Sequence, residues 1–112
     1  MIIRKIGIVL CTGALLLSAT VAMAGGNTQP GAIKEIGVWE GNNGILIVHP
    51  YPTNPDGCTR PEAILLAKTH PHYRELYSLL VSSQAIGRKV IIYVQGCVES
   101  FPRLTHLQAF DN

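Results

Sequence analysis

The serine and carboxylate side chains of this 112-residue sequence form no pattern typical of an enzyme. No serine lies in the G-x-S-x-G motif of a hydrolase nucleophile. No two carboxylates have a spacing that implies an acid and base pair. Glu75 is expected to be a charge in the first turn of a helix, where the helix dipole favours it. We therefore predict that the protein has no catalytic residue and is not an enzyme.

Four histidines are the most plausible metal ligands in the sequence. His70 and His72 flank Pro71, and His49 and His106 are possible additional ligands. However, this spacing is not that of a common metal site, and His70 is expected at a helix start, where polar residues satisfy free backbone amides. We predict no metal site and no cofactor.

Two aromatic residues are the candidate ligand-binding residues. Trp39 lies beside the turn-forming residues 41–44, and Tyr51 opens a proline-rich loop over 51–61. Both would flank one end of a β-barrel, where aromatic faces stack on sugars or other planar groups. The alternative has Tyr51 packing the loop and Trp39 in the core, which the usual burial of large aromatics in small domains favours for Trp39.

Residues 1–24 are predicted to be a secretory signal peptide. A short basic start precedes an apolar run from Ile6 to Ala22, and Ala22 and Ala24 supply the small residues that signal peptidase needs. We expect cleavage after Ala24 and a secreted or periplasmic protein with no membrane span. An uncleaved membrane anchor is the alternative, although the apolar run is at the short end for spanning a bilayer.

Cleavage would leave two cysteines, Cys58 and Cys97, in an oxidising compartment. An even pair in a small exported domain predicts a disulfide. The chain-entropy model gives such a bond about 4 kcal/mol of stabilisation. A redox or metal-binding role is disfavoured because the pair lacks a C-x-x-C spacing.

Cleavage would also neutralise the chain, whose net charge is +2. Of nine basic and seven acidic residues, only Arg4 and Lys5 precede position 25, which leaves seven of each sign. Nucleic-acid affinity comes mostly from basic side chains that neutralise phosphates, so we predict no nucleic-acid partner.

After the signal, a flexible lead-in is expected at 25–32 and a single domain at 33–112. A hairpin is predicted in which Asn43 and Gly44 tolerate positive φ. The short apolar run from Ala63 to Ala67 fits a strand or a helical turn, and its context favours a strand. The expected strands cover 33–40, 45–49, 63–67, 90–94 and 103–110, with a helix between Pro71 and Gly87.

Five strands with a helix between the third and fourth predict an OB-fold-like Greek-key barrel, a mainly β class with one helix. An open α+β sheet with the helix on one face would give a similar order. On the helix, the residues Arg74, Ser78 and Ser82 share a face that is free of large side chains and suits a pore or an oligomer interface. The opposite, apolar face is expected to hold Tyr73, Leu76, Tyr77, Leu80 and Gln84.

Three segments of the chain resemble the B subunits of subtilase cytotoxin and typhoid toxin. They are 73–80 in the helix, 86–94 with its glycine turn into a β-branched strand, and Ser100-Phe101-Pro102. The resemblance implies an OB-fold barrel, a ring-shaped homopentamer whose helices line a pore, glycan binding, and a separate secreted enzymatic subunit. This sequence has Pro30 and Gly31 where the family has a serine that contacts sialic acid, so the resemblance transfers no binding residue.

The leading hypothesis is an exported, non-enzymatic protein that binds carbohydrate as a ring oligomer. The first alternative is a monomeric periplasmic or secreted OB-like domain that binds a protein partner or has a structural role. The second is an inhibitor of an extracellular enzyme, with the loop Tyr51–Pro61 as its inserted element, because a disulfide-tied loop loses little entropy on binding.

Overall fold

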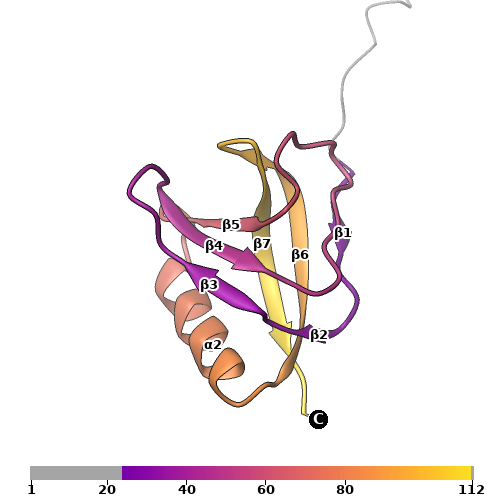
Figure 1. Ribbon diagram of the computed structural model, residues 1–112, viewed down its shortest axis with the longest axis vertical. Coiled ribbons are helices and arrows are strands. Elements are labelled where there is room, and N and C mark those ends of the chain that lie inside the picture. The colour runs from indigo at the N-terminus through magenta and orange to yellow at the C-terminus, as the bar shows by residue number, and fades with distance from the viewer. Residues whose placement is uncertain (1–23, 112) are drawn as a thin grey trace, which may run out of the picture.

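The computed structural model describes residues 24–111, which form a curved β-sheet and one α-helix (Figure 1). The predicted signal peptide, 1–24, lies outside these residues except for Ala24. In chain order the elements are β1 (Gly26–Asn27), β2 (Gly31–Ala32), β3 (Glu35–Gly37), β4 (Gly44–Val48), β5 (Ile64–Ala67), α2 (Tyr73–Ala85), β6 (Lys89–Val98) and β7 (Phe101–Ala109).

The strands of this region form one mixed sheet in the order β1-β6-β7-β5-β4-β3, and β2 also pairs with β6. The pairing of β5 with β7 is parallel, and the other pairings are antiparallel. The hydrogen-bonded order starts at β1 and ends at β3, so the sheet is not closed. The predicted class, mainly β with one helix, is confirmed.

The first predicted hairpin is present, but its turn works differently from the expectation. Strand β3 pairs antiparallel with β4, with Glu35 opposite Val48. Neither Asn43 nor Gly44 has a positive φ. Gly44 is needed for a different reason, because a Cβ at this position would overlap the backbone carbonyl of Leu66 on β5. The glycine allows two strands to approach closely.

The segment predicted to be a flexible lead-in, 25–32, contains β1 and β2, which both pair with β6. Between them Thr28 is buried, and its backbone N–H donates to the carbonyl of Ile92 at 2.9 Å. Its hydroxyl accepts a hydrogen bond from the Ile92 N–H at 3.0 Å. The first strand therefore begins at Gly26 and not at Ile33. Backbone hydrogen bonds order this segment, so it shows no apolar pattern in the sequence.

Strand β5 is buried along its whole length, which settles the ambiguous apolar run as a strand. Helix α2 begins two residues after the predicted Pro71, with His72 at its N-cap. It ends before Gly87, whose φ of 67° is the left-handed conformation that commonly stops a helix. Within residues 24–111, no helix has the length and apolar character needed to cross a membrane.

The buried face of α2 holds Leu76, Leu80 and Ser83, which lie at helical spacing. The predicted apolar face wrongly included Tyr77, which is 44% exposed. Figure 1 shows α2 below β3 in this view, where Leu76 and Leu80 join the main core. The helix thus covers one end of the apolar interior.

Strands β6 and β7 form the long hairpin that supports the rest of the sheet. Irregularities in the pairing of β6 lie on either side of Val94. Such bulges increase the local twist of a strand. Strand β7 starts at Phe101, two residues before the predicted Arg103, and pairs Phe101 with Val98 across the turn.

The predicted disulfide between Cys58 and Cys97 is confirmed, with Cα atoms 5.7 Å apart. It fastens the proline-rich loop to the end of β6. A small apolar cluster of Ala63, Leu65 and Phe101 is separate from the main core. The main core consists of Ile33, Ile45, Ile47, Ile64, Leu66, Leu76, Leu80, Val90, Ile92, Val94, Leu104 and Leu107.

Candidate functional site

Trp39 lies in the turn between β3 and β4 and is 62% exposed. The turn is closed by a 3.0 Å hydrogen bond from the Asn42 N–H to the carbonyl of Trp39. The indole folds back toward β3, since a Cβ on Gly37 would lie 2.9 Å from its Nε1. The core position considered for Trp39 is therefore wrong, and the indole is accessible to a ligand.

Trp39 borders a solvent-open hollow of about 350 Å³. Buried Ala63 and Phe101, with half-buried Leu46, form its apolar base. Its polar side chains are Asn42, Arg60 and Glu62. These residues come from three separate segments of the chain, so only the folded sheet creates the hollow.

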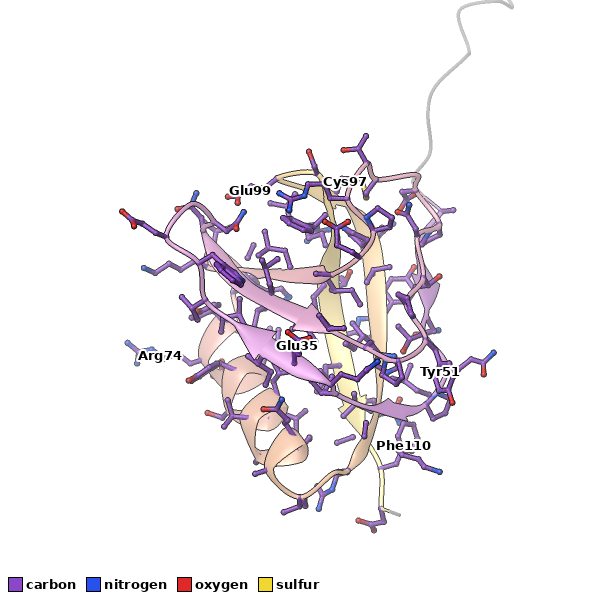
Figure 2. All side chains as sticks on the ribbon, viewed as in Figure 1. Glu35, Tyr51, Arg74, Cys97, Glu99 and Phe110 are labelled. Atoms are coloured by element: carbon purple, nitrogen blue, oxygen red, sulfur yellow. A yellow bond between two sulfur atoms is a disulfide. The ribbon has the colours of Figure 1, made fainter. Side chains whose placement is uncertain are left out.

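Glu99 fastens the Trp39 turn to the turn between β6 and β7. Its Oε1 accepts a 2.9 Å hydrogen bond from the Asn42 side chain, and its Oε2 accepts one of 2.9 Å from the Asn43 side chain. The backbone N–H of Asn43 donates to the same carboxylate at 3.2 and 3.3 Å. The bonds from Asn42 and then Asn43 hold the pKa of Glu99 below its ordinary value. Figure 2 shows Glu99 near Cys97, at the end of the molecule where β6 turns into β7.

The β6–β7 turn is held in an unusual backbone conformation. Glu99 and Ser100 have φ values of 52° and 75°, as a two-residue type I′ hairpin requires. Neither is one of the residues that adopt this conformation readily, so the backbone there stores strain. The Ser100 carbonyl accepts a 2.8 Å hydrogen bond from the Arg60 N–H. One strained turn therefore positions both the Trp39 turn and the segment that carries Arg60.

The Arg60 guanidinium lies over the Phe101 ring, with its Cζ 4.4 Å from the ring centroid. Its Nε donates to Glu62 at 3.2 Å, and both side chains are more than half exposed. An exposed ion pair of this kind adds little stability. Instead, the stacking orients a planar group with several N–H donors. The terminal guanidinium nitrogens make no hydrogen bond to residues 24–111.

An indole beside arginine, amide and carboxylate groups is suited to a polyhydroxylated ring. The C–H face of a sugar stacks on an aromatic ring, and its hydroxyls both donate and accept hydrogen bonds. Arg60 and Asn42 supply donors here, and Glu62 supplies an acceptor. The apolar base would contact the carbon atoms of the ligand.

Tyr51 is 52% exposed, but it lies past the opposite end of β4 from Trp39 and does not line the hollow. Figure 2 shows Tyr51 on the side of the molecule occupied by β2, away from Glu99. The structure therefore separates the two aromatic residues that the sequence placed at one end of a barrel.

Tyr51 is positioned by buried His49. The Tyr51 N–H donates to Nδ1 of His49 at 3.0 Å, and Nε2 of His49 lies 3.0 Å from the Val90 carbonyl. Nδ1 therefore acts as acceptor and Nε2 carries the proton, which is the neutral ring. Burial lowers the pKa of His49, partly opposed by the Val90 carbonyl. The neutral imidazole connects the start of the proline-rich loop to β6.

The three residues of the predicted pore or interface face, Arg74, Ser78 and Ser82, are exposed on α2. Figure 2 shows Arg74 pointing away from the helix. Tyr77 and Val81 lie beside them and are 44% and 39% exposed. This helix face therefore combines small polar residues with two exposed apolar ones.

A second hollow, of about 460 Å³, lies at the start of α2. All of its lining residues belong to the single segment 68–75, and none is an exposed aromatic residue. His70 in this segment bonds the Thr105 carbonyl at 2.8 Å and accepts the His72 N–H at 3.0 Å, which is a structural role. In the part of the chain that is described, no three histidine, cysteine, aspartate or glutamate residues group to hold a metal ion.

Sequence reasoning found Trp39 but missed the residues that complete its site. Glu99 lies 57 residues from Asn42, and no motif connects the two. The only local signal is that each belongs to a turn. Arg60 and Glu62 carried no signal, because exposed charged residues in a loop are common.

Comparisons of the chain with protein-family models, with curated proteins and with solved structures found no match. The Trp39 hollow is therefore the feature of the molecule from which we infer a function.

Proposed function

We propose that the protein is an exported, non-enzymatic binding protein that takes a carbohydrate into the Trp39 hollow. The observation that carries this proposal is the exposed indole of Trp39 beside Arg60 and Glu62, on a turn fastened by Glu99. The Trp39 turn is held in place before any ligand arrives, so binding would cost little ordering entropy.

The proposed export depends on the signal-like residues 1–24, and the Cys58–Cys97 disulfide is compatible with it. Disulfides persist in secreted and periplasmic proteins and are rare in the cytosol.

We also propose an OB-fold-like barrel for the sheet. Strands β2 and β3 are separated by only Ile33 and Lys34, and the Lys34 N–H donates to the Val48 carbonyl at 2.8 Å. If β2 and β3 are two halves of one bent strand, that strand pairs with β6 at one half and with β4 at the other. This arrangement, with α2 between β5 and β6, supports the Greek-key order of five strands.

A ring-shaped homo-oligomer with a separate secreted enzymatic subunit is the assembly implied by the resemblance to toxin B subunits. The exposed helix face with Ser78, Ser82, Tyr77 and Val81 supports it, because exposed apolar residues among small ones suit helix packing. Ser78→Arg would place a long charged side chain in this face, and Gln108→Arg on β7 is the matched control. Native mass spectrometry is expected to show an oligomer for the parent protein and the control, and a monomer for Ser78→Arg. A monomeric parent protein at micromolar concentration would exclude the ring.

A second function, inhibition of an extracellular enzyme, is supported by the rigid loop Tyr51–Pro61. Its Asn54 side chain bonds both the N–H and the carbonyl of Cys58, at 2.8 and 3.0 Å. Exposed Tyr51 would be the inserted side chain. Inhibition of a panel of proteases and glycosidases by the purified protein tests this alternative.

A glycan array with the exported protein tests the main proposal. We expect glycan binding that is lost in Trp39→Ala and retained in Tyr51→Ala, which removes an exposed aromatic ring outside the hollow. Loss of binding in both variants, or in neither, would contradict the placement of the site. Absence of any glycan binding would exclude the carbohydrate function.

A further inference from the structure

The carboxylate of Asp56 lies against the peptide bond at which signal cleavage is predicted. Its Oδ1 accepts a hydrogen bond from the Ala24 N–H at 2.6 Å, and its Oδ2 lies 3.3 Å from the Gly25 nitrogen. Oδ2 also accepts the Gly96 N–H at 2.7 Å. One side chain therefore connects the first described residues to the end of β6.

The turn that carries Asp56 is rigid. The Asn54 side chain bonds both backbone groups of Cys58, and the Gly57 N–H donates to the Asn54 carbonyl at 3.3 Å. The disulfide from Cys58 to Cys97 then fixes the turn next to Gly96. The carboxylate is held in position and does not need to be ordered by a ligand.

Gly25 occupies a niche that only glycine fits. Its φ is 65°, and a Cβ at this position would overlap the hydroxyl of Tyr93. The Tyr93 ring is itself stacked on His106, with centroids 4.7 Å apart. The niche therefore sets the direction of the Gly25 nitrogen, which faces Asp56.

We propose that Asp56 is the binding site for the α-ammonium group that signal-peptide cleavage creates on Gly25. Hydrolysis by signal peptidase adds the hydroxyl of water to the Ala24 carbonyl carbon and a hydrogen to the Gly25 nitrogen. That nitrogen takes up one more proton from solvent at neutral pH. The Ala24 hydrogen bond leaves with the signal peptide, and the Gly25 hydrogen bond becomes an ion pair.

The new ion pair would fasten β1 to β6 beside the disulfide. Charge-assisted hydrogen bonds are stronger than those between neutral groups. The hydrogen bond from the Gly96 N–H lowers the pKa of Asp56 most, burial opposes it, and the N–H groups of Ala24 and Gly25 lower it further. The pKa therefore lies below its ordinary value, and the carboxylate is ionised at neutral pH. The other titratable groups of the niche are Tyr93 and, behind it, His106. This inference rests on the export part of the proposed function.

The test uses the protein exported and processed by a bacterial host. Intact mass identifies the first residue, and NMR of the Gly25 α-carbon over pH 6 to 10 measures the pKa of its α-amino group. We expect this pKa to be higher in the parent protein than in Asp56→Asn by at least about half a unit, as for an amine beside a carboxylate. Asp111→Asn removes the same charge elsewhere on the surface and is expected to leave the pKa unchanged.

Equal α-amino pKa values in the parent protein and Asp56→Asn would overturn the proposal while leaving export intact. A retained signal peptide, or a mass that starts at another residue, would overturn it together with the predicted cleavage. If Asp56→Asn does not fold, a parent pKa within the ordinary range of about 7.7 to 8.0 would overturn it. Glycan binding at Trp39 is measured separately and affects none of these outcomes.

Discussion

Glu99 and Asn43 are 56 residues apart in the chain, and the Asn43 side-chain amide donates to the Glu99 carboxylate at 2.9 Å. The same carboxylate binds the Asn42 side chain at 2.9 Å. The Trp39 turn is therefore not a free loop, because a strained turn on the other hairpin holds it. The accessible indole and its fixed support together make this end of the sheet the candidate site.

Glu99→Gln is expected to release the Trp39 turn. A glutamine presents one oxygen and an N–H₂ group to two asparagine amides, so at least one donor faces another donor. We expect faster amide exchange at Asn43 and several-fold weaker binding of any ligand found for the hollow. Glu40→Gln, an exposed change in the same turn, is the control. Unchanged exchange in Glu99→Gln would show that the carboxylate does not fasten the turn.

Gly44→Ala is expected to destabilise the fold by about 2 kcal/mol or more, as overpacking of a tight contact does. The reason is the overlap of the added Cβ with the Leu66 carbonyl. Gly41→Ala is the matched control, because a Cβ there meets nothing within 4 Å and its φ is not positive. Urea unfolding of the two variants should separate them clearly. Similar midpoints would contradict the close approach of β4 and β5.

The stability of the protein is expected to fall as the pH decreases below 6.5. The pKa of His49 is lowered in the folded protein, so the unfolded chain binds a proton at His49 more readily. The stability that neutral His49 contributes is therefore complete above pH 6.5 and is lost as the pH falls toward the lowered pKa. Denaturant unfolding between pH 7.5 and 5 measures this dependence. His49→Gln should flatten it, whereas the exposed His72→Gln should not.

Two carboxylates extend this acid sensitivity to lower pH. Hydrogen bonds lower the pKa values of both Asp56 and Glu99 in the folded protein. The stability that each ionised carboxylate contributes is therefore present above its ordinary pKa and is lost as the pH falls through its lowered pKa. Loss of the Glu99 contacts would loosen the Trp39 turn. The protection factor of the Asn43 amide, its exchange relative to an unstructured peptide at the same pH, measures this, and equal protection factors at pH 3 and pH 7 would contradict the expectation.

Removal of the disulfide is expected to cost about 4 kcal/mol, the chain-entropy value for a 39-residue separation. The double change Cys58→Ala and Cys97→Ala avoids free thiols, and denaturant unfolding at pH 7 gives the difference. Thiol titration of the denatured, unreduced parent protein should detect no reactive thiol in the exported form. Two reactive thiols would show that the bond does not form.

Local patterns predicted several elements of this fold correctly. The Ile-rich run after Gly44 predicted β4, the helical signals between Pro71 and Gly87 predicted α2, and the cysteine pair predicted the disulfide. These features depend on residues that are near one another in sequence or, for the cysteines, on a chemistry with few possible partners.

The tertiary structure decided what those patterns left open. β1 and β2 have no apolar pattern, since backbone pairing with β6, together with the buried Thr28 hydroxyl, positions them. The exposure of Trp39 was also undetermined, because burial depends on which surfaces meet. Asn43 and Glu99 meet only when two hairpins pack together, and a sequence carries no local trace of such a contact. The residue types thus determined the elements and the bond between the cysteines, whereas the packing of distant turns determined the site.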